Sequence, residues 1–276
     1  MKPYDEAVVN PPGVRTQTVT ALRGGVVSTS PDWVAEEVPV ALVFNGISHA
    51  VMLASPNDLE DFALGFALTE GLLTDRSELY GVEVERDSRG ITVSLEVASA
   101  CEWRLKERRR NLAGRTGCGL CGTESLDQVG RNVPTAPAVS VPLGVLAKGQ
   151  RALREWQALQ QLTGAAHAAA WCDLEGRIVL LREDIGRHNA LDKLVGGLTA
   201  AGFDPQSGWV LVTSRASFEM VQKTAMAGAG VLAAVSAPTS MALDVAERCG
   251  LALAGFVRGD DFVAYTQAQR LGLRPA

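Results

Sequence analysis

The sequence REDIGRHNALDK occupies residues 182–193, where a predicted strand leads into a predicted helix. The strand is expected over Arg177–Leu181 and the helix over Asn189–Ala201. In α/β proteins, ligands gather where strands end and helices begin. The density of charged, imidazole and amide side chains therefore indicates a site, although a salt-bridged helix cap explains any single residue equally well. Arg187 and His188 are the candidates for ligand contact, and His188 is either a proton shuttle near neutral pH or a structural histidine.

Strands and helices alternate on both sides of this block. The expected strands are Ala168–Cys172, Arg177–Leu181, Gly208–Thr213, Val231–Val235, Leu251–Phe256 and Phe262–Tyr265. The expected helices are Leu143–Leu162, Asn189–Ala201, Phe218–Ala227 and Thr239–Arg248. Such alternation is typical of a layered α/β domain, which we place at residues 143–276.

The N-terminal part is predicted to form a small α+β domain over residues 1–132. Two apolar runs, Val38–Phe44 and Ile47–Leu53, are joined by Asn45-Gly46, the dipeptide that suits a type I′ hairpin turn. The remaining expectations are a β-like pattern over Val14–Thr29, a helix capped by Asn57 or Asp58, strands over Tyr80–Glu85 and Ile91–Val97, and a helix over Glu102–Asn111. Residues 133–142 hold three prolines and are predicted to be a linker.

Three further strand ends carry polar residues that suit an anionic ligand. Ser214 and Arg215 follow one predicted strand, residues 236–240 (SAPTS) follow the next, and residues 256–261 (FVRGDD) follow the one after. Backbone N–H groups at the start of a helix, together with arginine, bind phosphate well. Serine and threonine cap helices everywhere, so only the three together indicate a nucleotide-like ligand.

Two cysteines, Cys118 and Cys121, lie within the glycine-rich sequence GCGLCG at residues 117–122. Structural zinc needs four ligands, and the chain offers one such pair and no suitably spaced histidines. A thioredoxin-type pair opens a helix, whereas the glycines favour a loop. A sulfur carrier would receive sulfur as a persulfide on one thiol and release it with help from the other. The basic run upstream, within residues 104–115, favours the reactive thiolate.

Composition excludes several classes of protein. A net charge of −5 argues against a nucleic-acid binder. No signal peptide or membrane-spanning run is apparent, and five sparse cysteines suit a reducing compartment, so a cytoplasmic protein is expected. Cys101, Cys172 and Cys249 stand in apolar or helical context and are predicted to be core residues. The His-x-Glu and Pro-Cys-x-x-Cys signature of a zinc deaminase does not occur, and no metal site is expected.

These blocks together resemble the formate dehydrogenase accessory sulfurtransferase family, FdhD, over nearly the whole chain. The motifs that carry the resemblance are EEVPV at 36–40, Ser55-Pro56 through Glu70-Gly71, GCGLCG at 117–122, Thr163-Gly164 with His167-Ala168-Ala169, EDIGRHNALDK at 183–193, Ser214-Arg215 with Glu219-Met220-Val221 and Lys223, and Gly255-Phe256. The cysteine loop and the block at 183–193 are very specific in combination.

The resemblance implies a sulfurtransferase that takes persulfide sulfur from a cysteine desulfurase. The sulfur passes to the molybdenum cofactor, bis(molybdopterin guanine dinucleotide), before that cofactor enters formate dehydrogenase. Cys118 is implied to be the persulfide carrier and Cys121 its partner. The cofactor is implied to contact Phe256, Val257, Arg258, Gly259, Asp260 and Asp261, and its guanine nucleotide ends are implied to meet Ser214 and Arg215. A C-terminal domain similar to cytidine deaminases, without their zinc, and a homodimer are also implied.

Two points leave alternatives open. Asp260 and Asp261 would repel a phosphate, so either they point away or backbone amides make the contact. Two rival functions also remain. A dithiol oxidoreductase would need Cys118 and Cys121 equally, whereas a cofactor-binding chaperone would tolerate loss of Cys118 but need Arg215.

Overall fold

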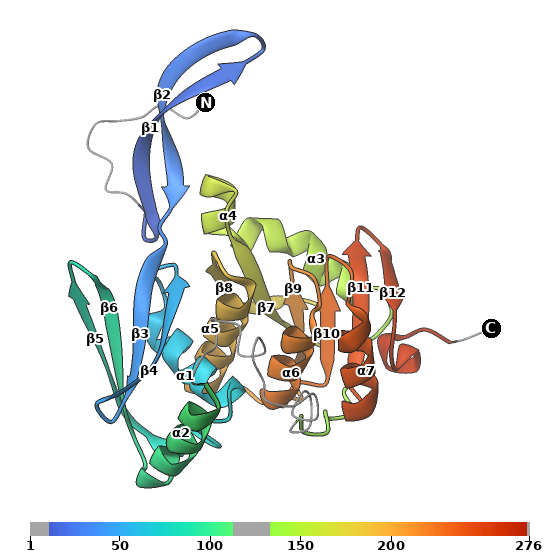
Figure 1. Cartoon of the computed structure of the whole chain (residues 1–276). Helices are drawn as coiled ribbons and strands as arrows, with labels where there is room; N and C mark the ends of the chain where they lie inside the picture. Colours follow the sequence, from blue (N-terminus) through green and yellow to red (C-terminus); the bar gives the residue numbers. More distant parts are fainter. Residues whose placement is uncertain (1–10, 113–132, 275–276) are drawn as a thin grey trace.

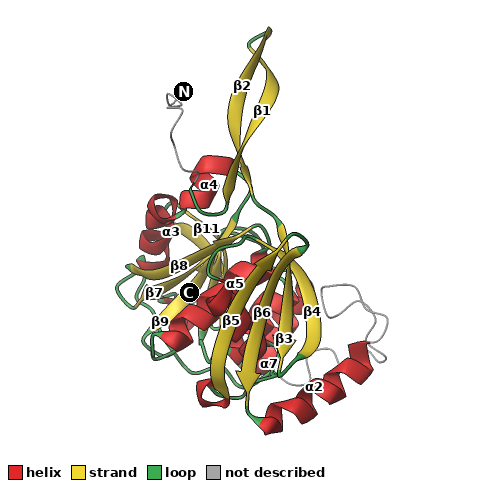
Figure 2. Ribbon diagram, turned by 90° about the vertical axis from the view of Figure 1, so that its left-hand side faces the viewer, coloured by secondary structure: helices red, strands yellow, loops and turns green. Residues whose placement is uncertain are grey.

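The computed structural model describes residues 11–112 and 133–274. Within these residues the chain forms three β-sheets, and the prediction of an α/β protein with an α+β N-terminal part is confirmed. A two-stranded hairpin, β1 (Val14–Arg23) with β2 (Val26–Ala35), projects from the rest of the molecule (Figures 1 and 2). The β-like pattern expected up to Thr29 therefore belongs to two paired strands that continue to Ala35.

The N-terminal sheet has the order β4-β3-β6-β5. Its strands are β3 (Val38–Phe44), β4 (Ile47–Ala54), β5 (Leu79–Asp87) and β6 (Gly90–Val97), and its helices are α1 (Leu59–Thr69), η1 (Arg76–Glu78) and α2 (Ser99–Leu112). The hairpin predicted at Asn45-Gly46 is confirmed: φ is 47° at Asn45 and 78° at Gly46, as a type I′ turn requires. Asn45 also exchanges two hydrogen bonds with the backbone of Val97, which fixes the turn beside β6.

The C-terminal sheet has six strands in the order β12-β11-β10-β9-β7-β8. The strands are β7 (His167–Asp173), β8 (Ile178–Asp184), β9 (Gly208–Val212), β10 (Val231–Ala234), β11 (Ala252–Arg258) and β12 (Asp261–Ala264). The helices are α3 (Val145–Trp156), α4 (Ala158–Thr163), α5 (Arg187–Ala200), α6 (Phe218–Met226), α7 (Ser240–Cys249) and η3 (Ala268–Leu271). β9, β10 and β11 are parallel, whereas β7 runs antiparallel to both of its neighbours.

Helices cover both faces of this sheet. Successive residues of a strand point to opposite faces, so both sets of side chains in a central strand are packed against helices. In β9, Val210 and Val212 pack on the side of α5, α6 and α7, whereas Trp209 and Leu211 pack on the side of α3. The apolar runs that the sequence shows in these central strands therefore reflect burial on both faces.

One continuous helix was expected over Leu143–Leu162, and this prediction is wrong. The helix breaks at Gln157, whose ψ of 73° is not helical, and α4 begins at the next residue. The carboxylate of Glu183 in β8 accepts hydrogen bonds from the backbone N–H groups of Leu159 and Gln160, at 2.7 and 2.9 Å. A tertiary contact that satisfies the first N–H groups of a new helix thus outweighs the local helical pattern.

The two sheets are joined by a close crossing of α1 and α5. A Cβ atom added at Gly65 would lie 1.7 Å from the carbonyl oxygen of Asp192, and one at Gly196 would lie 1.8 Å from that of Asp61. The two helix backbones are therefore in direct contact, which only glycine permits. Residues 133–142 have no helix or strand, yet Ala136, Val139 and Val141 are buried; the domain boundaries placed there remain a prediction.

Candidate functional site

The polar motifs of the sequence meet at one edge of the six-stranded sheet. β8, β9, β10 and β11 end at this edge, and β7 begins there, since His167 pairs with Asp184, the last residue of β8. Thr213 then holds the end of β9 to β7: its Oγ1 accepts from the N–H of Ala168 at 2.9 Å, and its N–H donates to the Ala168 carbonyl. Farther along the edge, the N–H of Phe256 donates to the carbonyl of Ser236 at 3.1 Å.

Three helices begin at this edge. The residues that precede them are Gly186 for α5, Ser217 for α6 and Thr239 for α7. In the described part of the chain, neither Ser217 nor Thr239 makes a side-chain capping hydrogen bond, and Gly186 has no side chain to make one. Helix N-termini carry partial positive charge, so this edge is electrostatically suited to an anion.

The block at residues 182–193 divides into structural residues and residues that face the edge. Asp184 and Lys193 form an ion pair at 2.7 Å, and both side chains are fully buried. Asp184 also accepts hydrogen bonds from the N–H and Oγ of Ser55, and Asn189 donates to it at 3.0 Å. These residues fasten the segment after β4 to the C-terminal sheet, so their role is structural.

A second buried cluster surrounds Lys223 of α6. Its Nζ donates to both carboxylate oxygens of Asp192, to Thr69 Oγ1 and to Glu70 Oε1, all within 2.9–3.0 Å. Burial disfavours the ammonium, but the two carboxylates outweigh it and raise the pKa of Lys223. Burial raises the pKa of Asp192 to about 6 even beside this cation. Lys223 entered the sequence analysis only through the family resemblance, and no local pattern predicts its burial in such a cluster.

Arg187 and His188, the first two residues of α5, lie next to the start of α6. His188 Nε2 lies 3.9 Å from Glu219 Oε2. Burial and then the charge of Arg187 lower the pKa of His188 to about 4, so the imidazole is neutral near pH 7. Burial and Arg187 also lower the pKa of His167.

Among the described residues, no hydrogen-bond partner is found for three buried polar atoms at the starts of α5 and α6: Arg187 Nε, His188 Nε2 and Ser217 Oγ. A buried polar atom left unsatisfied costs about 1–3 kcal/mol, so such atoms call for an explanation. The sequence analysis assigned ligand contact to Arg187 and His188 but not to Ser217, because a serine before a helix is expected to cap it. We name Arg187, His188, Ser217 and Glu219 the α5–α6 cluster.

The other predicted contact residues lie along the same edge but differ in availability. Ser214 is buried and its Oγ donates to the carbonyl of Arg215, whereas Arg215 is exposed. Phe256 is 42 % exposed and has a φ of 52°, a conformation that a bulky residue rarely adopts. Such strain is typical of functional positions. Val257 by contrast is fully buried in the core.

The hairpin after β11 carries Asp260 and Asp261, the two carboxylates that were expected to repel a phosphate, and the structure shows what one of them contacts. Asp260 forms an ion pair with Arg151 of α3, and the N–H of Gly259 donates to Gln150 Oε1. Arg258 and Asp261 are exposed, and Arg258 Nε donates to the Val235 carbonyl at 3.3 Å. Asp260 is thus paired with Arg151, so its carboxylate does not face an incoming anion as an unpaired charge.

Cys118 and Cys121 lie outside the described residues. Cys101, Cys172 and Cys249 are buried, which confirms the prediction that they are core residues. Burial raises the pKa of all three thiols. Within residues 11–112 and 133–274, no three or more His, Cys, Asp or Glu side chains lie together as metal ligands.

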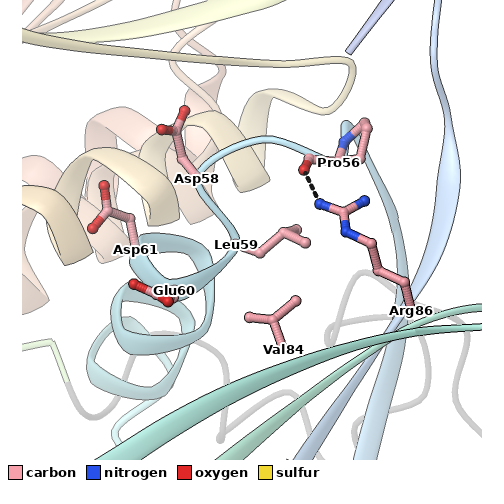
Figure 3. A pocket seen from close by; sticks show the side chains of 7 residues that line it. All are labelled: Pro56, Asp58, Leu59, Glu60, Asp61, Val84 and Arg86. Carbon is pink, nitrogen blue, oxygen red and sulfur yellow. Dashed lines mark hydrogen bonds between the residues drawn. The ribbon is translucent and has the colours of Figure 1, made fainter. Parts of the chain in front are cut away.

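A hollow of about 480 Å³ lies elsewhere, at the start of α1 (Figure 3). It is lined by Pro56, Asp58, Leu59, Glu60, Asp61, Val84 and Arg86, and Arg86 donates to the Pro56 carbonyl at 3.1 Å. The lining has three carboxylates, and although Arg182 pairs with Asp58 and Asp61, the excess of negative charge does not favour an anionic ligand. In the part of the chain that the structure describes, no helix is long and apolar enough to cross a membrane.

Comparison with known proteins places this architecture in a family. The sequence model of the FdhD/NarQ family matches residues 35–272. The proteins named sulfur carrier protein FdhD from Bordetella petrii and Variovorax paradoxus are 60% and 61% identical to this chain, over 93% and 89% of it and 94% and 88% of their own lengths. The chain therefore belongs to the FdhD/NarQ family.

A solved structure has the same fold. The crystal structure of a putative formate dehydrogenase accessory protein from Desulfotalea psychrophila superimposes with a TM-score of 0.75. It covers 94% of this chain and 100% of its own, at 22% sequence identity. The similarity to cytidine deaminases remains a prediction.

Proposed function

We propose that this protein is a sulfur carrier that supplies sulfur to a molybdenum cofactor destined for formate dehydrogenase. The observation that carries the proposal is the pair Cys118 and Cys121 between glycines, in a chain that belongs to the FdhD/NarQ family. Three relatives carry the name sulfur carrier protein FdhD, which supports the proposal. The cysteine desulfurase, formate dehydrogenase, the homodimer and a cytoplasmic location are parts of the same proposal.

The proposed chemistry uses two thiols of this chain, a persulfide donor and an external thiol reductant. The Cys118 thiolate attacks the outer sulfur of a desulfurase persulfide; the S–S bond of the donor breaks, and Cys118 becomes the persulfide. Once the acceptor is bound, the Cys121 thiolate attacks the inner sulfur, so hydrosulfide leaves for the cofactor and a Cys118–Cys121 disulfide forms. Two sulfur atoms are oxidised while the sulfane sulfur is reduced, so the electrons balance. An external thiol reductant resets the disulfide.

The acceptor is proposed to bind at the edge of the six-stranded sheet. Bis(molybdopterin guanine dinucleotide) is a large anion, and three uncapped helix starts face this edge. The unsatisfied Arg187 Nε and Ser217 Oγ are suitable donors for its phosphates, and the exposed Arg215 and Phe256 are available for its guanine nucleotide ends. Of the segment 256–261, Val257 is assigned a role in holding the hairpin rather than in contact.

The test is the intact mass of the protein after incubation with a cysteine desulfurase and cysteine. We expect the mass of one added sulfur, which a reductant removes and Cys118→Ala lacks. Cys249→Ala is the matched control, because that thiol is buried, and should still be loaded. An unmodified wild-type protein in a competent assay would favour a cofactor chaperone, whereas disulfide cycling without sulfur loading would favour a dithiol oxidoreductase.

A further inference from the structure

The α5–α6 cluster combines features that recognise an anion. Arg187 and His188 open α5, Ser217 precedes α6, and the distance of 3.9 Å between His188 and Glu219 shows that the two helix starts adjoin. Ser217 is more than nine-tenths buried, and its Oγ has no partner within residues 11–112 and 133–274. The helix N-termini and an unsatisfied buried hydroxyl are thus two independent indications of a ligand.

The charges in the cluster favour a phosphate group but leave one obstacle. Lys223 is occupied by Asp192 and Glu70, so among the four residues of the cluster the positive charge comes from Arg187. Glu219 is a carboxylate at the same place, and it would repel a phosphate. A metal ion is not favoured instead, since the described residues provide no group of three ligands here.

We propose that a phosphate group binds between the N-termini of α5 and α6 and that His188 takes up a proton from solvent as it enters. The imidazolium then stands between Glu219 and the anion and removes their repulsion. This inference rests on the anionic acceptor of the proposed function and adds that its capture is coupled to a proton.

The groups around His188 explain why it is neutral before binding and charged afterwards. Arg187 on its own helix and Lys223 on α6 disfavour the imidazolium, whereas Glu219 on α6 and Glu70 at the end of α1 favour it. Burial is the largest influence, and it lowers the pKa of His188 to about 4. An incoming phosphate adds negative charge beside the ring and reverses that balance.

NMR of the imidazole nitrogens tests this directly, because the chain has three histidines. Single His→Gln variants assign the signals of all three. With saturating GDP near neutral pH, we expect the His188 signals to move from the neutral to the cationic pattern. A His188 that stays neutral in the saturated complex overturns the proposal.

Binding measurements give a second, independent test. As the pH rises, the GDP affinity of the wild type should fall more steeply than that of His188→Gln. The difference between the two slopes should be up to about tenfold in affinity per pH unit, because the titration of the phosphates is common to both proteins. Glu219→Gln should bind more tightly, with a weaker dependence on pH. Equal slopes for the wild type and His188→Gln would refute the coupling.

Comparison of GDP, inorganic pyrophosphate and guanosine shows which part of the nucleotide causes the proton uptake. Inorganic pyrophosphate should bind with the same proton uptake as GDP, whereas guanosine should not cause it. If neither GDP nor pyrophosphate binds, the site is refuted. The mass test on Cys118 does not depend on this site, so persulfide loading would show that the carrier function stands even then.

Discussion

Lys223 in α6 donates to both carboxylate oxygens of Asp192 in α5, at 2.9 and 3.0 Å, in a position almost inaccessible to solvent. The same ammonium reaches Glu70 at the end of α1. One cation therefore neutralises carboxylates from two helices, one of them in the N-terminal part of the chain. Its removal would leave Asp192 as an uncompensated buried charge.

Lys223→Met is therefore expected to destabilise the protein by about 3–5 kcal/mol, as loss of one partner of a buried ion pair does. Urea unfolding near neutral pH measures it. Lys148→Met, an exposed position, is the control and should change stability by less than about 0.5 kcal/mol. A loss as small as that of the control would contradict the structural role assigned to Lys223.

The pH dependence of the same variant has a definite sign. The pKa of Asp192 is already raised to about 6 by burial with Lys223 present, and removing the cation raises it further. A carboxyl with a raised folded-state pKa contributes stability at low pH that is lost as pH rises through that pKa. The deficit of Lys223→Met should therefore shrink from pH 8 towards about pH 5, and Asp192→Asn in the same chain should remove much of this trend.

Gly65→Ala and Gly196→Ala should each destabilise the protein by about 1–3 kcal/mol through overpacking. In an exposed helix the same change would stabilise by about 1 kcal/mol, so the sign itself is diagnostic. Gly197→Ala is the matched control, because its added Cβ would meet mainly side-chain atoms of Asp61 and Leu180, which can move. Thermal unfolding of the three variants should rank Gly197→Ala as the mildest; a stabilised Gly196→Ala would contradict the crossing.

Arg187→Gln should weaken GDP binding by about ten- to a hundredfold, the usual value of a hydrogen bond from a charged donor. Arg177→Gln is the control, since Arg177 pairs with Asp173 and Glu175 at the turn between β7 and β8, away from the site. Calorimetric titration compares the two. Equal affinities for both variants would place the phosphates elsewhere.

Thiol accessibility gives a prediction for the described cysteines. In a Cys118→Ser/Cys121→Ser double variant, iodoacetamide should add no label to the native protein, because Cys101, Cys172 and Cys249 are buried and burial raises their pKa values. After denaturation, intact mass should show one label on each of them. Rapid labelling of the native double variant would contradict their burial.

Sequence patterns predicted what depends on local chemistry. The positive φ angles at Asn45-Gly46 and the alternation of strands and helices after residue 143 follow from nearest neighbours. The break at Gln157 did not, because it depends on Glu183, which is remote in sequence but adjacent in space. The block at residues 182–193 looked like one site, yet Asp184 and Lys193 turned inward to Ser55, a partner that no local pattern identifies.

The direct contact of α1 with α5 has a consequence for how the molecule unfolds. No side chains separate the helix backbones at Gly65 and Gly196, so α1 and α5 have little freedom to slide or rotate past each other. The four-stranded and six-stranded sheets should therefore melt as one cooperative unit. Calorimetric and van't Hoff enthalpies should agree for the whole chain, despite its two separate sheets.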